Sequence, residues 1–202
     1  MIETECGGDL WVARLSRPAK ANALTRAMLT DLAAFAETAQ GRARALVLTG
    51  TGRVFSAGMD LTEAEDLAAD PLWERVSGAV AAFRGLSIAA LNGTAAGGAL
   101  GMVLACDLRI AVPGAQIFYP VMARGYLPQP SDPVRLARLA GPGRAAMLLL
   151  AGQKVGVEEA LAWGLVDRVV PAEDLDAASR DLAAVVLAAD PAHAAAIKEM
   201  IR

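Results

Sequence analysis

At 202 residues the chain is long enough to form one domain with a sizeable core, since a chain of this length buries about 70% of its unfolded surface. Hydrophobic residues make up 55% and charged residues 20%, which agrees with a single domain over residues 1–202. The formal net charge of −3 offers no basic surface for nucleic acid, so we expect no nucleic-acid partner.

The N-terminal half is predicted to alternate strands and helices. Residues 10–15 read as a strand, and Thr25 can cap a helix that ends at Gly41. Apolar residues of this helix recur every three or four positions and so share one face: Met28, Leu29, Leu32 and Phe35. Residues 45–49 read as a buried strand, and a helix opens at Pro71 and closes at Gly85.

The C-terminal half continues the alternation. Asp132 can cap a helix that has Pro133 at its first position. Two alanine-rich helices close the chain, the second starting near Pro191. The remaining predicted elements are strands at 88–91, 107–112 and 166–170, and helices starting at 141–142 and over 158–163. Repeated alternation of strand and helix favours a parallel sheet with covering helices.

Two glycine-bearing loops are the most informative feature of the chain. Residues 55–61 read Phe-Ser-Ala-Gly-Met-Asp-Leu, and residues 92–100 read Asn-Gly-Thr-Ala-Ala-Gly-Gly-Ala-Leu. Each loop follows an apolar run, and glycine lets a backbone turn sharply and come close to a ligand. Two such turns can point two N–H groups at one point, as in an oxyanion hole. Neither loop matches a P-loop, a dinucleotide fingerprint or a nucleophile elbow.

Cysteine usage and hydropathy bear on where the protein works. Cys6 and Cys106 lie far apart without metal-ligand spacing, and the N-terminus resembles no secretory signal. We therefore expect free thiols, no metal site and a cytoplasmic location. Residues 85–106 carry no charge and are long enough to cross a bilayer. The turn sequence Asn92-Gly93 splits this run into a buried strand and a buried helix, so we expect no membrane partner.

The chain resembles the enoyl-CoA hydratase/isomerase (crotonase) family in six segments that occur in the family's order. Besides the two glycine loops, these are residues 17–24 (Arg-Pro-Ala-Lys-Ala-Asn-Ala-Leu), 106–111 (Cys-Asp-Leu-Arg-Ile-Ala), 125–128 (Gly-Tyr-Leu-Pro) and 160–167 (Ala-Leu-Ala-Trp-Gly-Leu-Val-Asp). The resemblance implies an α/β fold of the ClpP/crotonase type, a spiral of ββα turns with a helical C-terminal segment over 172–202. It also implies an acyl-CoA substrate, no separate cofactor, and assembly as a homotrimer or dimer of trimers involving that segment.

The resemblance also assigns a site. The oxyanion donors would be the backbone N–H groups of Met59 and Gly98, each of which typically contributes about 3 to 4 kcal/mol of transition-state stabilisation. Lys20 can meet the CoA phosphates, and Arg124 can pair with a carboxylate on the substrate. Tyr119 and Tyr126 can donate a proton, line the acyl pocket or simply pack. The substrate-binding residues implied in full are Lys20, Ala21, Leu24, Ala57, Gly58, Gly97, Tyr119, Val121, Arg124 and Gln129.

The acid/base positions of the family are replaced. Hydratases of this family activate water with two glutamates, and these positions fall on Gly101 and Val121. An aspartate used by some isomerases falls on Gln129. None of the three exchanges a proton at neutral pH, and losing one positioned acid or base costs about 10²- to 10⁴-fold in rate. Three other carboxylates are alternative acid/base groups, each with a structural interpretation as a fixed family position or a helix cap: Asp60, Glu63 and Asp132.

Three functions are compatible with this sequence. The first is an acyl-CoA enzyme, a lyase or isomerase, that stabilises a thioester enolate in a backbone oxyanion hole. The second is a catalytically silent acyl-CoA-binding homologue, which the missing glutamates favour. The third is an α/β protein whose glycine loops are structural. We expect the first.

Overall fold

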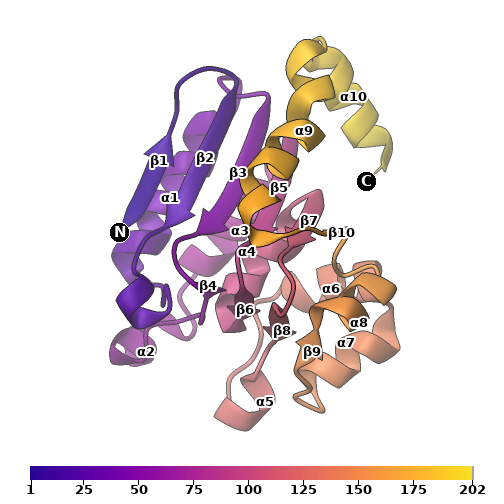
Figure 1. Cartoon of the computed structure of the whole chain (residues 1–202). Helices are drawn as coiled ribbons and strands as arrows, with labels where there is room; N and C mark the ends of the chain where they lie inside the picture. Colours follow the sequence, from indigo (N-terminus) through magenta and orange to yellow (C-terminus); the bar gives the residue numbers. More distant parts are fainter. Residues whose placement is uncertain (202) are drawn as a thin grey trace.

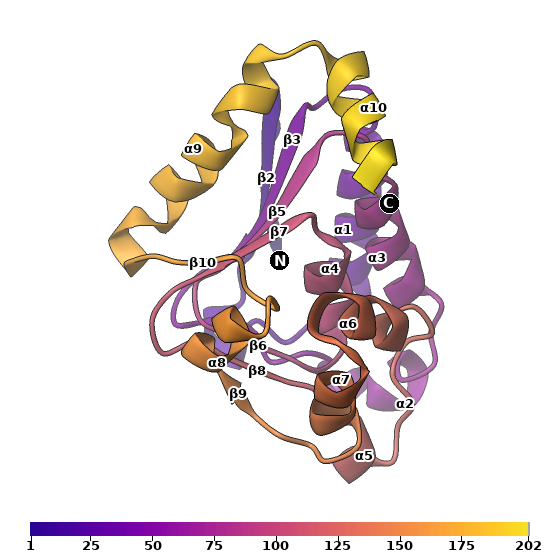
Figure 2. The same ribbon diagram turned by 90° about the vertical axis from the view of Figure 1, so that its right-hand side faces the viewer.

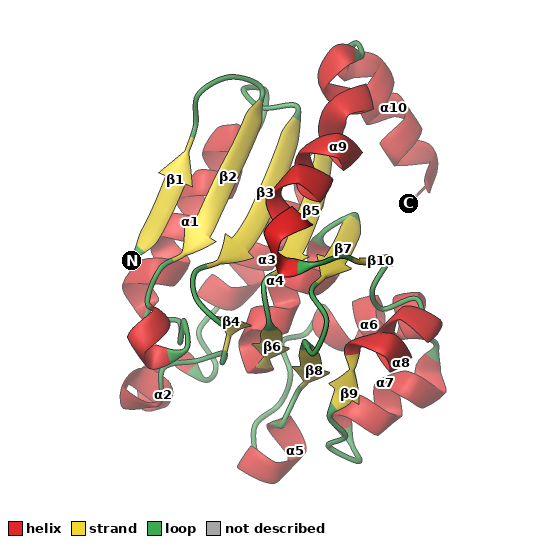
Figure 3. Ribbon diagram, viewed as in Figure 1, coloured by secondary structure: helices red, strands yellow, loops and turns green. Residues whose placement is uncertain are grey.

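A six-stranded sheet and a four-stranded sheet form the centre of the computed structural model, which describes residues 1–201 (Figures 1 and 3). The larger sheet contains, in spatial order, β1 (Ile2–Glu5), β2 (Leu10–Leu15), β3 (Ala45–Gly50), β5 (Leu86–Leu91), β7 (Leu108–Ala111) and β10 (Arg168–Val169). The smaller sheet contains β4 (Val54–Ser56), β6 (Thr94–Ala96), β8 (Gln116–Phe118) and β9 (Val155–Gly156).

Helices alternate with these strands along the chain. They are α1 (Arg26–Ala39), α2 (Ala64–Leu67), α3 (Leu72–Ala82), α4 (Leu100–Ala105), α5 (Val121–Arg124), α6 (Asp132–Ala140), α7 (Pro142–Leu149), α8 (Val157–Ala162), α9 (Leu175–Ala188) and α10 (Pro191–Ile201). Short 3₁₀ turns lie at η1 (Pro18–Lys20), η2 (Leu61–Glu63), η3 (Gly97–Ala99) and η4 (Ala172–Asp174). Helix α9 covers one face of the larger sheet, and α1, α3 and α4 lie on the other (Figure 2).

Most neighbouring strands run parallel, as predicted. This holds for β2, β3, β5, β7 and β10 in the larger sheet and for β4, β6 and β8 in the smaller one. The exceptions are β1, antiparallel to β2, and β9, antiparallel to β8. Strand β1 was not predicted because its sequence, Ile-Glu-Thr-Glu, is mostly exposed at the sheet edge and so carries no pattern of burial.

Helix α1 forms as the sequence indicates. The Thr25 hydroxyl accepts a hydrogen bond from the Met28 N–H at 3.3 Å and so caps the helix. The predicted apolar face is buried against the sheet: Met28, Leu29, Leu32 and Phe35. Local sequence therefore fixes both the start and the buried side of this helix.

The uncharged run over residues 85–106 forms β5, β6 and α4. The turn at Asn92-Gly93 divides it as predicted, but the short strand β6 after the turn was missed. The preceding helix α3 ends at Ala82, earlier than the predicted Gly85, since the chain at Gly85 already runs against β3. A Cβ on Gly85 would lie 2.0 Å from the Arg44 carbonyl oxygen. Within the described residues no helix is long and apolar enough to cross a bilayer.

The two cysteines are free thiols, as expected. Cys6 is exposed, and Cys106 is buried at the end of α4. Burial raises the pKa of the Cys106 thiol to about 12. The side chain therefore behaves as a small apolar core residue rather than as a nucleophile.

Candidate functional site

The first glycine loop is held by a short bridge to the segment before α1. The Leu24 N–H donates to the Gly58 carbonyl at 2.7 Å, and the Asp60 N–H donates to the Leu24 carbonyl at 2.9 Å. These two bonds lie on either side of Met59 along the chain. In a parallel bridge the residue between the two bonded neighbours, here Met59, points its own N–H away from the partner segment. The Met59 N–H is therefore directed away from Leu24.

The second glycine loop touches the first. Gly58 has φ +90°, and a Cβ there would lie 2.8 Å from the Ala96 carbonyl oxygen. Gly98 lies in η3, whose first N–H groups have no acceptor within the turn. A Cβ on Gly98 would lie 3.0 Å from the ring of Trp73, so only glycine leaves this backbone segment undisturbed. The contact between the loops thus depends on a glycine at position 58, and the packing of the second loop against α3 depends on one at position 98.

A cavity of about 470 Å³ lies where the two loops meet. This volume is within the range of small-molecule sites. The structure places these sequence-predicted residues in its wall: Lys20, Ala57, Met59, Asp60, Gly97, Gly98, Tyr119, Val121 and Arg124. The wall also contains Ala23, from the loop that the resemblance assigns to CoA, and Tyr126, which the sequence offered beside Tyr119. Residues of the wall that were not assigned from the sequence are Leu61, Thr62 and Pro120. The wall is contributed by segments from both halves of the chain.

The other predicted binding residues support this wall from behind. Leu24 is fully buried in the bridge with Gly58 and Asp60. The Ala21 carbonyl accepts a hydrogen bond from the Ala57 N–H at 2.9 Å. Gln129 approaches Tyr119 with its backbone N–H, 3.5 Å from the hydroxyl oxygen, and not with its side chain.

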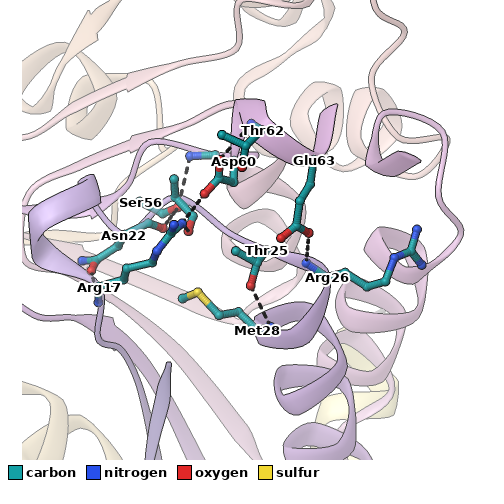
Figure 4. Close-up of polar contacts among 11 residues, drawn as sticks. Arg17, Asn22, Thr25, Arg26, Met28, Ser56, Asp60, Thr62 and Glu63 are labelled. Carbon is teal, nitrogen blue, oxygen red and sulfur yellow. Dashed lines mark hydrogen bonds and ion pairs between the residues drawn. The ribbon is translucent and has the colours of Figure 1, made fainter. Parts of the chain in front are cut away.

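Asp60 is fully engaged in contacts within the protein (Figure 4). Its carboxylate pairs with Arg17 and accepts hydrogen bonds from the Thr62 N–H at 2.9 Å and the Thr62 hydroxyl at 2.8 Å. The Arg17 guanidinium, with these hydrogen bonds, lowers the pKa of Asp60 to about 2. The carboxylate is therefore ionised and hydrogen-bonded, which favours a structural role over proton transfer.

Asn22 and Ser56 complete the same polar cluster. The Asn22 side chain accepts from the Arg17 N–H at 2.8 Å and donates to the carbonyls of Thr51 and Val54. The Ser56 hydroxyl donates to the Asn22 carbonyl at 2.8 Å and accepts from the Gly58 N–H at 3.1 Å. The first glycine loop is thereby fixed by buried, satisfied polar groups.

Glu63 supports the start of α1. Its carboxylate accepts a hydrogen bond from the Arg26 N–H at 2.8 Å (Figure 4). This N–H is one of those that a helix start leaves without an intrahelical partner. The contact is exposed and lies outside the cavity wall, which favours the capping interpretation of Glu63.

The prediction that Asp132 caps α6 is wrong. Ser131 occupies the cap position and Asp132 is the first helical residue. The Asp132 side chain is fully buried and accepts a hydrogen bond from the Tyr119 hydroxyl at 2.8 Å. Its other oxygen, Oδ1, has no hydrogen-bond partner among residues 1–201. Burial raises the pKa of Asp132 to about 6.

The room for this carboxylate comes from Gly101. A Cβ on Gly101 would lie 3.0 Å from Asp132 Oδ1. A glycine inside a helix costs about 1 kcal/mol relative to alanine, so its presence in α4 calls for a packing reason. Gly101 also follows Gly98 by three residues, a spacing that places neighbours on one helical face. The carboxylate thus lies beside the helical turn that begins at the second glycine loop.

A second cavity of about 440 Å³ adjoins the first and is almost wholly apolar. The two cavities share Val121 and Tyr126 in their walls. Helices α5, α6 and α7, with the loop before α6 and the residue after α7, contribute the remaining residues: Met122, Leu127, Pro128, Pro133, Ala137, Pro142, Ala145, Ala146, Leu149 and Leu150. In the part of the chain that the structure describes, no group of three or more His, Cys, Asp or Glu side chains is placed to hold a metal ion.

Comparison with known proteins gives consistent matches over nearly the whole chain. Residues 6–202 match the family model described as enoyl-CoA hydratase/isomerase. A putative enoyl-CoA hydratase/isomerase of Bacillus subtilis, YngF, is 38% identical over 186 residues, covering 88% of this chain and 72% of the relative. A 4-chlorobenzoyl coenzyme A dehalogenase of Arthrobacter sp. is 34% identical over 204 residues, covering 95% of this chain and 74% of the relative.

Solved structures agree with the sequence matches. DspI of Pseudomonas aeruginosa superposes with a TM-score of 0.90 at 36% identity, over 99% of this chain and 85% of that one. An enoyl-CoA hydratase from Bacillus anthracis superposes with a TM-score of 0.91 at 30% identity, over 99% of this chain and 81% of that one. These similarities confirm the predicted α/β fold class.

Proposed function

The chain belongs to the enoyl-CoA hydratase/isomerase family, and we propose that it binds an acyl-CoA thioester and stabilises the enolate formed from it. The thioester oxygen accepts hydrogen bonds from the backbone N–H groups of Met59 and Gly98. Both residues line one cavity, in loops that touch each other. This juxtaposition is the single observation that carries the proposal.

The hydrogen-bonding pattern supports these two donors. The bridge to Leu24 uses the bonds on either side of Met59 and turns the Met59 N–H to the far side of the loop. The Gly98 N–H lies in the first turn of η3, where helical partners are lacking. Fixed donors of this kind stabilise the charge that develops on an oxygen and are typically worth about 3 to 4 kcal/mol each.

The walls of the two cavities indicate where the CoA moiety and the acyl group of the substrate would lie. Lys20, in the wall of the first cavity, meets the phosphates of CoA. Arg124, in the same wall, pairs with a carboxylate where a substrate carries one. The acyl group extends past Val121 and Tyr126 into the apolar second cavity, which favours an aliphatic chain. CoA enters as part of the substrate, and we propose no separate cofactor.

We also propose assembly as a homotrimer or dimer of trimers in the cytoplasm. Helices α9 and α10 expose large apolar side chains, with Val185 82%, Met200 87% and Ile201 73% exposed. Apolar patches of this kind mark association surfaces. Light scattering coupled to gel filtration tests the proposal, and a monomer at all concentrations would contradict it.

The first experiment is calorimetric titration with a four-carbon and an eight-carbon enoyl-CoA, followed by the ultraviolet absorbance of the conjugated thioester. We expect binding, and loss of absorbance where the substrate is converted. Gly98→Ala displaces Trp73 and is expected to lower turnover by about 10²-fold or more. Gly143→Ala is the matched control, because Gly143 in α7 is exposed and its Cβ would meet nothing within 4 Å.

The outcomes separate the alternatives. Binding with turnover supports the enzyme. Binding of both thioesters without conversion of either one favours a catalytically silent binder. The observation that supports this alternative is the presence of Gly101 and Val121 at the family's glutamate positions. No binding would overturn the proposal.

A further inference from the structure

Tyr119 and Asp132 form a buried pair beside the cavity that the proposed oxyanion hole does not use. The Tyr119 hydroxyl donates to Asp132 Oδ2 at 2.8 Å. Tyr119 follows strand β8 and lines the same cavity as Met59 and Gly98, whereas Asp132 lies behind it at the start of α6. The phenol therefore stands between the cavity and the carboxylate.

The surroundings of Asp132 are unlike those of a structural carboxylate. One of its oxygens has no partner among the described residues, although the side chain is fully buried. Burying a carboxylate without satisfying its oxygens is costly. Residue 101, within helix α4, is a glycine and has no side chain. A Cβ at this position would crowd the same Asp132 oxygen. The glycine is explained by the space that the carboxylate needs, but nothing in the packing explains why a carboxylate is buried there with one oxygen unsatisfied.

The surroundings of Tyr119 suit a proton relay, that is, a side chain that accepts one proton while it passes its own to Asp132. Its hydroxyl oxygen also lies 3.5 Å from the Gln129 N–H, a contact that favours negative charge on that oxygen. Burial and the neighbouring carboxylate raise the pKa of Tyr119 above its ordinary value. A free phenolate is therefore disfavoured, and Tyr119 accepts a proton only as it gives its own to Asp132.

We propose, resting on the function proposed above, that Tyr119 is the catalytic residue that moves a proton to and from the acyl-CoA, and that Asp132 is its proton acceptor and positioning residue. The C–H bond at the α-carbon of the thioester breaks, and its proton passes to the Tyr119 oxygen. The Tyr119 proton passes to Asp132 Oδ2, and the electron pair of the C–H bond moves to the thioester oxygen as an enolate. The reverse steps return a proton to carbon.

The charged groups around the pair set its pH dependence. Arg135 on α6 favours the ionised form of Asp132, whereas Glu74 on α3 disfavours it. The Glu74 carboxylate is itself held by Ser131, at 2.9 Å from the Ser131 N–H. Because Asp132 accepts the proton, proton abstraction requires its ionised form. The rate should rise with pH through an apparent pKa near 6 and then level off.

The test is exchange of the α-protons of butyryl-CoA with deuterium from D₂O, followed by proton nuclear magnetic resonance. This saturated thioester has no double bond to hydrate, so the signal reports enolate formation alone. The variants are Tyr119→Phe and Asp132→Asn, and exposed Asp31→Asn is the matched control. Calorimetry measures binding of butyryl-CoA to each protein, and circular dichroism measures folding.

We expect exchange by the wild type and by Asp31→Asn, and a decrease of about 10²-fold or more in both site variants with binding retained. We also expect Asp132→Asn to lose the inflection near pH 6 that Asp31→Asn keeps. Exchange at the wild-type rate by Tyr119→Phe would overturn the relay. So would wild-type protein that binds butyryl-CoA without exchanging its α-protons, although the thioester site would then stand. Absence of binding by the wild type would overturn the proposed function and the relay with it. Should Asp132→Asn fail to fold, Tyr119→Phe still decides the question.

Discussion

Two carboxylates near the same cavity differ in how the protein treats them. Asp60, in the first glycine loop, is ion-paired with Arg17 and accepts two hydrogen bonds from Thr62. Asp132, beside the helix that follows the second loop, accepts a hydrogen bond from the Tyr119 hydroxyl, and its Oδ1 has no hydrogen-bond partner within residues 1–201. The pKa of Asp60 is lowered to about 2, and that of Asp132 is raised to about 6.

These opposite shifts in pKa identify the carboxylate that is available for chemistry. Charged partners stabilise the ionised Asp60, so its contacts contribute to the stability of the loop. Burial destabilises the ionised Asp132, so its site is maintained at a cost in folding free energy. A group whose pKa is moved toward neutrality in this way can exchange a proton under physiological conditions.

Gly58→Ala is expected to lower the free energy of unfolding more than any other substitution considered, because it disturbs the hydrogen-bonded loop that contains Asp60. The positive φ and the 2.8 Å approach of a Cβ to the Ala96 carbonyl both oppose the substitution. We expect the free energy of unfolding to fall by about 3 kcal/mol, measured by urea denaturation. Gly8→Ala is the control, because Gly8 has φ +88° and open space around it. Equal losses in the two variants would show that the contact between the loops contributes nothing.

Asp60→Asn should destabilise the protein at neutral pH by about 2 kcal/mol, since Arg17 loses its charged partner. The folded-state pKa of Asp60 lies below its ordinary value, so this contribution is present above about pH 4 and lost as pH falls toward 2. Urea denaturation across this range should therefore show the gap between wild type and variant closing in acid. A gap that stays constant with pH would contradict the ion-pair account.

Asp132→Asn should act in the opposite direction. The folded-state pKa of Asp132 lies above its ordinary value, so the wild type is penalised as pH rises from about 4 through 6. At neutral pH the neutral amide should raise the free energy of unfolding by about 1 to 2 kcal/mol, with the gain absent near pH 4. If Asp132→Asn instead lowered the free energy of unfolding at neutral pH as much as Asp60→Asn does, the claim that the ionised Asp132 destabilises the fold would be wrong.

The smallest effect is expected from Glu63→Gln. The exposed carboxylate supports one N–H at the start of α1, and Thr25 already caps this helix. We expect the free energy of unfolding to fall by about 0.5 kcal/mol, measured by thermal denaturation. A loss of several times this size would show that Glu63 belongs to the same cooperative cluster as Asp60.

Sequence reasoning succeeded where the signal was local. Thr25 and the spacing of apolar residues predict the start and the buried face of α1. Several of the site residues that the resemblance assigned line one cavity, whereas Ala21, Leu24, Gly58 and Gln129 do not; the roles of all of them stay a prediction. The prediction for Asp132 failed because an aspartate followed by Pro133 has the same local sequence whether it caps a helix or is buried as the first residue of one. What distinguishes them is the approach of Gly101, a contact between helices distant in the chain. Likewise, nothing near Asp60 in sequence predicts its pairing with Arg17.

The proposed function requires that the thioester oxygen lie between the N–H groups of Met59 and Gly98. Its most direct test is the ¹³C resonance of carbonyl-labelled butyryl-CoA bound to the wild type, Gly98→Ala and Gly143→Ala. Hydrogen bonds to the oxygen polarise the carbonyl, so we predict a downfield shift on binding to the wild type and Gly143→Ala that is reduced in Gly98→Ala. A bound thioester whose carbonyl resonance stays at its position in free solution would contradict the account.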